Sequence, residues 1–197
     1  MNNILIIYHE DFSCYEKLKR KVKNITKNMA NFKVTSTHDT RNLLLTLSNE
    51  ISFKLELELE LELETISHAI IFNYDGAYND MIEKIKEKKI PIRLITLKLT
   101  KAINIKGTNL GKDSTDTYEY IGRGSKWGNP YSMYEDGDDR DEVMRKFKHD
   151  FEFDKFLNVK KEDFLCLKGK KLGCFCKPDA CHGDVIADYL NSLDDYE

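Results

Sequence analysis

Hydrophobic positions in the first half of the chain change repeatedly between two spacings. Residues 3–8 (NILIIY) form a short continuous apolar run, which is typical of a strand buried on both faces of a parallel sheet. The next apolar positions recur at helical spacing, at Tyr15, Leu18, Val22 and Ile25. Strand patterns follow at residues 32–35, 66–74 and 92–97, and helix patterns at residues 41–47 and 79–88. This alternation predicts an α/β fold with a mostly parallel sheet and right-handed crossovers.

Five consecutive Leu-Glu pairs at residues 55–64 interrupt this pattern. Strict alternation predicts an extended edge strand or hairpin arm with one apolar and one charged face. Because Leu and Glu are also good helix formers, a mobile or helical insertion is the alternative. An exposed edge with a row of leucines favours pairing with another copy of the chain, so homo-oligomer formation through this segment is one hypothesis.

Periodicity is lost over residues 101–117, where Gly, Asn, Ser and Asp accumulate. We therefore predict a first domain at residues 1–100, a linker at 101–117 and a second domain at 118–197. In the second domain, the pattern predicts a short strand that leads into a Gly-rich loop, a helix at 139–157, a strand at 172–176 and a last helix at 184–193. These elements predict a small α+β domain.

Composition and charge narrow the class of protein. The 197 residues carry 31 Lys and Arg against 34 Asp and Glu, so no overall positive field favours nucleic acid or a membrane surface. The first apolar run is too short for a membrane span and has no basic flank, so we expect neither a signal peptide nor a membrane anchor. Without a secretory signal, clustered cysteines favour a metal or a reactive thiol over disulfides.

The stretch GRGSKWGNP at residues 122–130 is the first candidate site. Arg123 and Lys126 can hold a phosphate or carboxylate, Trp127 can stack on a flat ring, and Asn129 can bond a polar edge. The alternative is that Trp127 is a core aromatic and that residues 128–130 are only a turn.

The stretch LGCFCKPDACHGD at residues 172–184 is the second candidate site. An extended strand would separate Cys174 and Cys176 by about 6.5 to 7 Å, and adjacent side chains such as Cys181 and His182 diverge. We therefore expect that these four residues do not all ligate one metal ion, and we predict no metal ligand. A zinc site and inert buried cysteines remain alternatives to a polar site that uses His182 and Asp184 at the start of the last helix.

Polar residues directly after the first strand, His9, Glu10 and Asp11, occupy the position of ligand sites in parallel sheets. A solvated polar turn is the alternative. No motif identifies a cofactor, so the cofactor stays unknown.

The second half resembles a family of bacteria, phages and large viruses that is catalogued as a domain of unknown function. Two ordered motifs carry the resemblance: Ile-Gly-Arg and Trp-Gly-Asn-Pro at residues 121–130, and Leu-Gly-Cys-Phe-Cys-Lys-Pro with Cys-His-Gly-Asp at residues 172–184. The match spans about residues 119 to 190. The family implies no particular activity.

The first half resembles the Rossmann-like superfamily of the DNA-processing protein A and the LONELY GUY phosphoribohydrolases. The stretch HAIIFNYDGAYNDMIEKIKEKKIPIRLI at residues 68–95 is similar to the strand, glycine turn, helix and second strand of that superfamily. The resemblance implies a Rossmann-like, mostly parallel sheet and a nucleotide-like ligand. Tyr8, His9 and Glu10 stand where that superfamily has a glycine, and Ala77 follows Gly76, so we predict no phosphate cradle at these turns.

These observations predict binding, with or without processing, of a nucleotide-derived or nucleobase-containing small molecule, with His182 and Asp184 as the catalytic pair. The resemblance implies that an enzymatic activity would be that of a hydrolase or transferase on a nucleotide-like N-glycoside. The second hypothesis is a zinc-supported module that binds protein or nucleic acid through Lys168, Lys170 and Lys171. The third is a structural, self-assembling protein. We expect a cytoplasmic location, in the host cytoplasm or virion if the source is viral.

Overall fold

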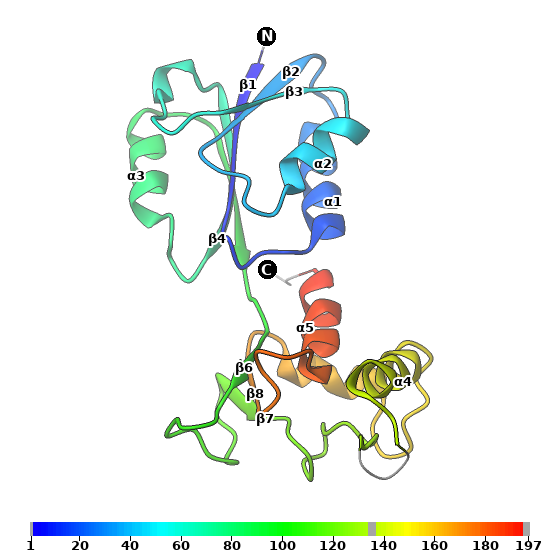
Figure 1. Ribbon diagram of the computed structural model, residues 1–197. Helices are drawn as coiled ribbons and strands as arrows, with labels where there is room; N and C mark the ends of the chain where they lie inside the picture. The colour runs from blue at the N-terminus through cyan, green and yellow to red at the C-terminus, as the bar shows by residue number, and fades with distance from the viewer. Residues whose placement is uncertain (1, 134–136, 195–197) are drawn as a thin grey trace. The chain divides into compact units, whose positions relative to one another are not determined.

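A computed structural model describes residues 2–133 and 137–194. Residues 1, 134–136 and 195–197, which the predicted domain ranges include, lie outside the described part. The chain divides into two compact units, one up to Leu97 and one from Lys98 to Leu193 (Figure 1). No helix of the described residues is long and apolar enough to cross a bilayer.

The first unit is a five-stranded parallel sheet with the strand order β3-β2-β1-β4-β5. Helices α1 and α2 lie on one face of the sheet, and α3 lies on the other (Figure 1). The α/β prediction with a mostly parallel sheet is confirmed. Its elements are β1 (Asn2–Tyr8), α1 (Tyr15–Thr26), β2 (Phe32–Ser36), α2 (Leu43–Glu50), β3 (Lys54–Leu57), a 3-10 turn (Leu63–Thr65), β4 (His68–Tyr74), α3 (Asn79–Glu87) and β5 (Ile92–Leu97).

Strands β1 and β4 form the centre of this sheet, because their runs are apolar on both faces. Every residue of β1 from Asn3 to Tyr8 is buried, as are residues 69–73 of β4. On the side of α3, Leu5, Ile7 and Ile71 pack with Ile82 and Ile85 of the helix. The strand order reverses between β1 and β4. The chain adds β2 and β3 on one side of β1 and then β4 and β5 on the other, as in Rossmann-like sheets.

The Leu-Glu repeat divides between two structures. Its first pairs lie in β3, an edge strand that pairs in parallel with β2. The extended edge strand is therefore present, but only as far as Leu57; the later pairs form a loop and the 3-10 turn, and Leu59 is 97% exposed. Homo-oligomer formation through the repeat stays a prediction.

The second unit contains a smaller parallel sheet with the order β6-β8-β7. Its elements are β6 (Lys101–Asn104), β7 (Tyr118–Tyr120), α4 (Arg140–Glu152), a 3-10 segment (Lys161–Leu167), β8 (Lys171–Cys174) and α5 (His182–Ser192). The predicted linker at 101–117 thus begins inside a strand, because β6 pairs with β8, which lies about 70 residues further along the chain.

Candidate functional site

The Gly-rich loop begins directly after β7 and folds back on itself. The Ile121 amide still donates to Gly173 of β8 at 2.9 Å, and two turns follow, from Ser125 to Gly122 and from Gly128 to Ser125. A side chain at Gly128 would lie 2.9 Å from the backbone oxygen of Gly122. Glycine is therefore required where the two arms of the loop meet.

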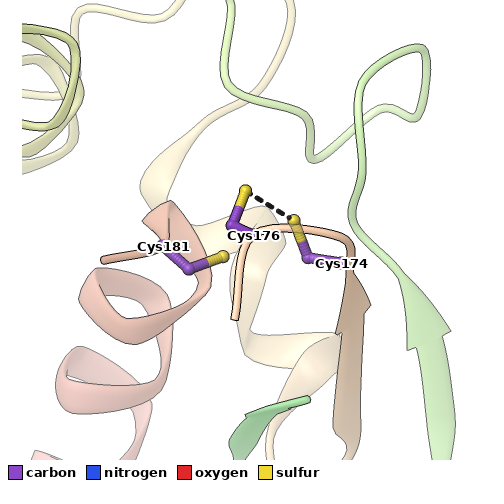
Figure 2. A group of neighbouring side chains, drawn as sticks. All are labelled: Cys174, Cys176 and Cys181. Carbon is purple, nitrogen blue, oxygen red and sulfur yellow. Dashed lines mark hydrogen bonds between the residues drawn. The ribbon is translucent and has the colours of Figure 1, made fainter. Parts of the chain in front are cut away.

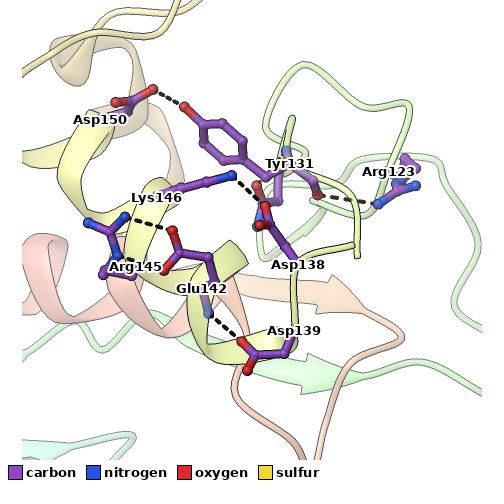
Figure 3. Close-up of polar contacts among 9 residues, drawn as sticks. Arg123, Tyr131, Asp138, Asp139, Glu142, Arg145, Lys146 and Asp150 are labelled. Carbon is purple, nitrogen blue, oxygen red and sulfur yellow. Dashed lines mark hydrogen bonds and ion pairs between the residues drawn. The ribbon is translucent and has the colours of Figure 1, made fainter. Parts of the chain in front are cut away.

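Arg123 is an exposed cation of this loop. Its guanidinium donates to Ser132 Oγ and to the Tyr131 backbone oxygen, each at 3.4 Å (Figure 3). These acceptors are neutral, and among the described residues no carboxylate pairs with it. An exposed arginine in this state is available to an anion.

A cavity of about 750 Å³ adjoins Arg123. The loop forms one side of its lining, and the end of α4 with the segment after it forms the other. Its lining includes the cations Arg123, Lys126 and Lys155, the polar residues Ser125, Asn129, Ser132 and Asn158, the rings of Tyr131 and Phe156, and Asp150. The volume lies within the range of small-molecule sites.

Asp150 in this lining is already engaged. The Tyr131 hydroxyl donates to its carboxylate (Figure 3). His149 contacts the same carboxylate from the same helix. The hydrogen bond to Asp150, together with burial, raises the pKa of Tyr131 to about 12, and the Tyr131 bond is the main reason that the pKa of Asp150 is lowered. Tyr131 and Asp150 were not among the sequence candidates; Tyr131 directly follows the Asn-Pro pair, which was the available signal.

Trp127 lies in the core of the second unit and is 7% exposed. Its indole packs against Phe164 at 5.1 Å between ring centroids, and its Nε1 donates to Glu119 at 3.0 Å. The Lys126 ammonium lies 4.8 Å from the ring centroid. Trp127 lines a hollow of about 250 Å³ with Lys126 and does not line the large cavity. Its predicted stacking role stays a prediction.

Three of the five cysteines converge at the other motif (Figure 2). The sulfur atoms of Cys174, Cys176 and Cys181 all lie within 4.8 Å of one another. The strand expected to reach Cys176 ends at Cys174, Phe175 is a bend, and the sulfurs of Cys174 and Cys176 lie 3.2 Å apart. The thiols of Cys174 and Cys181 donate toward Cys176 and lower its pKa.

His182 is buried at the first position of α5, with 4% exposure. Its Nε2 donates to the Ile121 backbone oxygen at 2.8 Å, which leaves Nδ1 as the unprotonated nitrogen of the neutral ring. Nδ1 lies 3.8 Å from the Cys181 sulfur. Burial lowers the pKa of His182 and so favours this neutral form.

Asp184 has two structural partners. Its carboxylate accepts from the Cys181 amide at the start of α5 and pairs with the Lys177 ammonium at 2.7 Å. Helix α5 thus begins two residues earlier than expected, with Cys181 as the N-cap and Asp184 inside the first turn. Asp184 does not line the cavity of about 750 Å³, and it does not line a smaller cavity of about 110 Å³ that adjoins His182.

The structure brings the two motifs together. A second cavity, of about 110 Å³, is lined by Arg123 and Asn129 from the first motif and by Cys174, Cys176 and His182 from the second. Arg123 and Asn129 also line the large cavity. Asn129 and His182 therefore line one cavity although they come from separate motifs, and their roles stay predictions.

The polar residues at the carboxyl edge of the first sheet are used differently. Tyr8 donates to Asp39, and the backbone oxygen of Tyr8 accepts from the His38 ring at 2.7 Å and from the Tyr78 hydroxyl at 2.8 Å. His9 contacts Asp11 at 3.4 Å. Several side chains at this edge, such as Tyr8, His38 and Tyr78, therefore already have hydrogen-bond partners within the unit.

Backbone amides at the turn around Gly76 also donate hydrogen bonds within the first unit. The amides of Ala77 and Asn79 donate to backbone oxygens of Tyr74 and Gly76, and the Tyr78 amide donates to Asn73 Oδ1 at 3.1 Å. These three amides therefore already have acceptors. The absence of a phosphate cradle at this turn stays a prediction.

Lys170, one of the three lysines of the nucleic-acid hypothesis, already has partners within the second unit. Lys170 donates to the Thr115 backbone oxygen at 3.0 Å and pairs with Glu119 at 3.4 Å. Its ammonium is therefore held within the domain.

Comparisons with known proteins match both halves. A family model described as the minimal SLOG domain matches residues 1–103, and a model described as a domain of unknown function, DUF4326, matches residues 103–192. Over 91 residues the chain is 37% identical to the "Uncharacterized 12.4 kDa protein in nrdA-td intergenic region" of Enterobacteria phage T4, which covers 45% of this chain and 82% of that protein. No solved structure matches. The chain therefore belongs to the minimal SLOG family through its first half and carries a DUF4326 domain in its second.

Proposed function

We propose that the large cavity of the second unit binds an anionic, nucleotide-derived small molecule. The observation that carries the proposal is the Arg123 guanidinium, which lines a cavity of about 750 Å³ and pairs with no carboxylate of the described residues. A planar guanidinium binds phosphate and carboxylate groups through paired hydrogen bonds.

The rest of the lining suits such a ligand. Lys126 and Lys155 add positive charge, while the single carboxylate of the lining, Asp150, already accepts from Tyr131. The Asn129 side-chain oxygen accepts from the Tyr131 amide at 2.9 Å, so its NH₂ group is the part that can bond a polar edge. Tyr131 and Phe156 offer rings to a nucleobase in place of Trp127, whose indole packs in the core.

The ligand class is suggested by the first unit, which matches the minimal SLOG domain. That unit resembles Rossmann-like domains with nucleotide-binding and nucleotide-cleaving members. The proposal is one of binding. It assigns no acid-base step to His182, whose Nε2 is bonded to Ile121, or to Asp184, which caps α5 and pairs with Lys177.

The test begins with the purified full-length chain, whose retained small molecules are identified by mass spectrometry. Calorimetric titration with adenosine 5′-monophosphate and with adenosine then measures the contribution of the phosphate. We expect the monophosphate to bind more tightly, and Arg123→Ala to weaken its binding by about tenfold or more, because a charge-assisted bond is lost.

Arg145→Ala is the matched control. Arg145 lies on α4, is 67% exposed, pairs with Glu142 and lines neither cavity, so its loss should leave binding unchanged (Figure 3). The proposal fails if Arg123→Ala behaves like Arg145→Ala, or if no mononucleotide of a panel with the four common bases binds to the unaltered chain.

A further inference from the structure

We propose that Cys174, Cys176 and Cys181 bind one zinc ion through three thiolates, with the fourth coordination position open toward the small cavity. The three cysteines do not line the cavity of the proposed nucleotide site. Either proposal can therefore be wrong while the other is right.

The positions of the three sulfurs carry the proposal. Cys174 ends β8, Cys176 follows the bend at Phe175, and Cys181 caps α5, so separate elements direct their sulfurs to one point (Figure 2). All three sulfurs lie within 4.8 Å of one another. Tetrahedral zinc with Zn–S bonds of about 2.3 Å requires sulfur separations of about 3.8 Å, so small shifts of the side chains suffice.

Burial alone does not account for this arrangement. Cysteines that serve only as small apolar side chains would pack against carbon, as Cys174 and Cys181 also do in the core of this unit. Cys176 is only partly buried, yet its sulfur turns toward that of Cys174 at 3.2 Å. Three sulfurs held together in this way match the soft ligand set that zinc prefers.

The start of α5 favours negative charge on the Cys181 sulfur. The Gly183 amide donates to the Cys181 sulfur at 3.3 Å, at the positive N-terminal end of α5. Three thiolates and one zinc ion carry a net charge of −1, which the positive end of α5 partly offsets.

The fourth position has no protein ligand among the described residues. His182 Nδ1 lies 3.8 Å from the Cys181 sulfur, but the His182 ring nitrogens do not lie within 4.8 Å of all three sulfurs. Cys174 and Cys176 line the small cavity together with Arg123 and Asn129. An ion held here would therefore present its open position to a cavity, as zinc sites with three protein ligands do for water or substrate.

The first test measures metal content. The full-length chain is purified with a reductant and without chelators, and its zinc is quantified by elemental mass spectrometry. We expect about one zinc per chain, and a loss of most of it in Cys176→Ser. Cys176 is chosen because it is partly exposed, so its substitution should spare the fold. Cys166→Ser is the matched control, because Cys166 is exposed and lies outside the cluster.

The second test uses cobalt, which does not depend on any variant folding. Replacement of zinc by Co²⁺ in the unaltered chain should give sulfur-to-cobalt charge-transfer bands and the strong visible bands of tetrahedral coordination. Addition of imidazole should then shift the visible bands if the fourth position is open.

Two outcomes overturn the inference. A folded chain that contains no zinc and gives no cobalt bands shows that the cysteines are structural thiols. Cobalt bands that imidazole does not shift, together with loss of zinc in His182→Ala, show that His182 closes the site.

Discussion

The two units of this chain use polar side chains in opposite ways. At the carboxyl edge of the first sheet, where Rossmann-like folds bind their ligands, the groups bond one another: Tyr8 to Asp39, and His38 and Tyr78 to the backbone of Tyr8. In the second unit, Arg123 lines a cavity, and its acceptors among the described residues are neutral. The comparison favours the second unit for the proposed ligand site, because polar groups that already bond one another are less available to a ligand than Arg123 is.

The largest effect on stability is expected at the edge of the first sheet, from Asp39→Ala. The Asp39 carboxylate accepts from the buried Tyr8 hydroxyl and from the Leu44 and Leu45 amides at the start of α2. Its loss leaves these donors without that acceptor, so we expect the free energy of unfolding to fall by about 2 to 3 kcal/mol. Urea unfolding measures this change, and hydrogen exchange should show that β1 and α2 lose protection.

Glu87→Ala, at an exposed position of α3, serves as the control for Asp39→Ala and should change stability little. The comparison breaks if Asp39→Ala leaves stability unchanged but weakens binding of adenosine 5′-monophosphate. That result would move the ligand site to the first unit.

An intermediate effect is expected from Gly183→Ala, which tests how the second unit positions its cysteines. A side chain at Gly183 would lie 2.6 Å from Ile121 Cδ1 and 3.0 Å from Ala102 Cβ. The start of α5 must then shift, and we expect a loss of about 1 to 2 kcal/mol, because the gain in helix propensity offsets part of the overpacking.

Gly111→Ala is the matched glycine control, since a side chain there meets nothing within 4 Å. Because Cys181 lies two residues from Gly183, its sulfur should move away from those of Cys174 and Cys176, and zinc content should fall together with stability. Unchanged stability and zinc content in Gly183→Ala would show that the helix start is not held by this close packing.

The sequence predicted those features that depend on local patterns. Apolar runs such as residues 3–8 and 69–72 are legible as buried strands because both faces of a parallel strand are covered, and the helical spacing of Leu18 and Val22 marks a buried helix face. The approach of the two motifs of the second unit was also predictable, since both contain polar residues at the ends of elements. Arg123, Asn129 and His182 do line one cavity.

Features that depend on contacts between residues far apart in the sequence could not be predicted. Strand β6 was taken for linker because its pairing with β8 is set by residues about 70 positions away. The strand expected at 172–176 stops at Cys174, and this bend changes two separated thiols into neighbours. Whether Trp127 stacks on a ligand or packs in a core could not be decided from its neighbours in sequence, because Phe164 and Glu119 contact it from other elements.

The smallest effect is expected at the wall of the large cavity, from Tyr131→Phe. This change removes the hydroxyl that donates to Asp150 but keeps the ring and the backbone oxygen that Arg123 contacts. Because Asp150 is close to solvent, we expect a loss of about 1 kcal/mol or less at neutral pH, with binding of adenosine 5′-monophosphate within about twofold of the unaltered chain.

The pH dependence of that loss identifies its cause. The pKa of Asp150 is lowered from 3.8 in the folded chain, so its contribution to stability is complete above pH 3.8 and disappears as the pH falls through the lowered value. The pKa of Tyr131 is raised from 10.0 to about 12, so its contribution is complete below pH 10.0 and disappears as the pH rises through about 12. The difference in unfolding free energy between the unaltered chain and Tyr131→Phe should therefore be flat at intermediate pH and decline at both extremes. His149→Ala, which removes the weaker partner of Asp150, should give a smaller difference. A difference that stays constant down to pH 2 would show that the hydroxyl stabilises the chain through packing and not through Asp150.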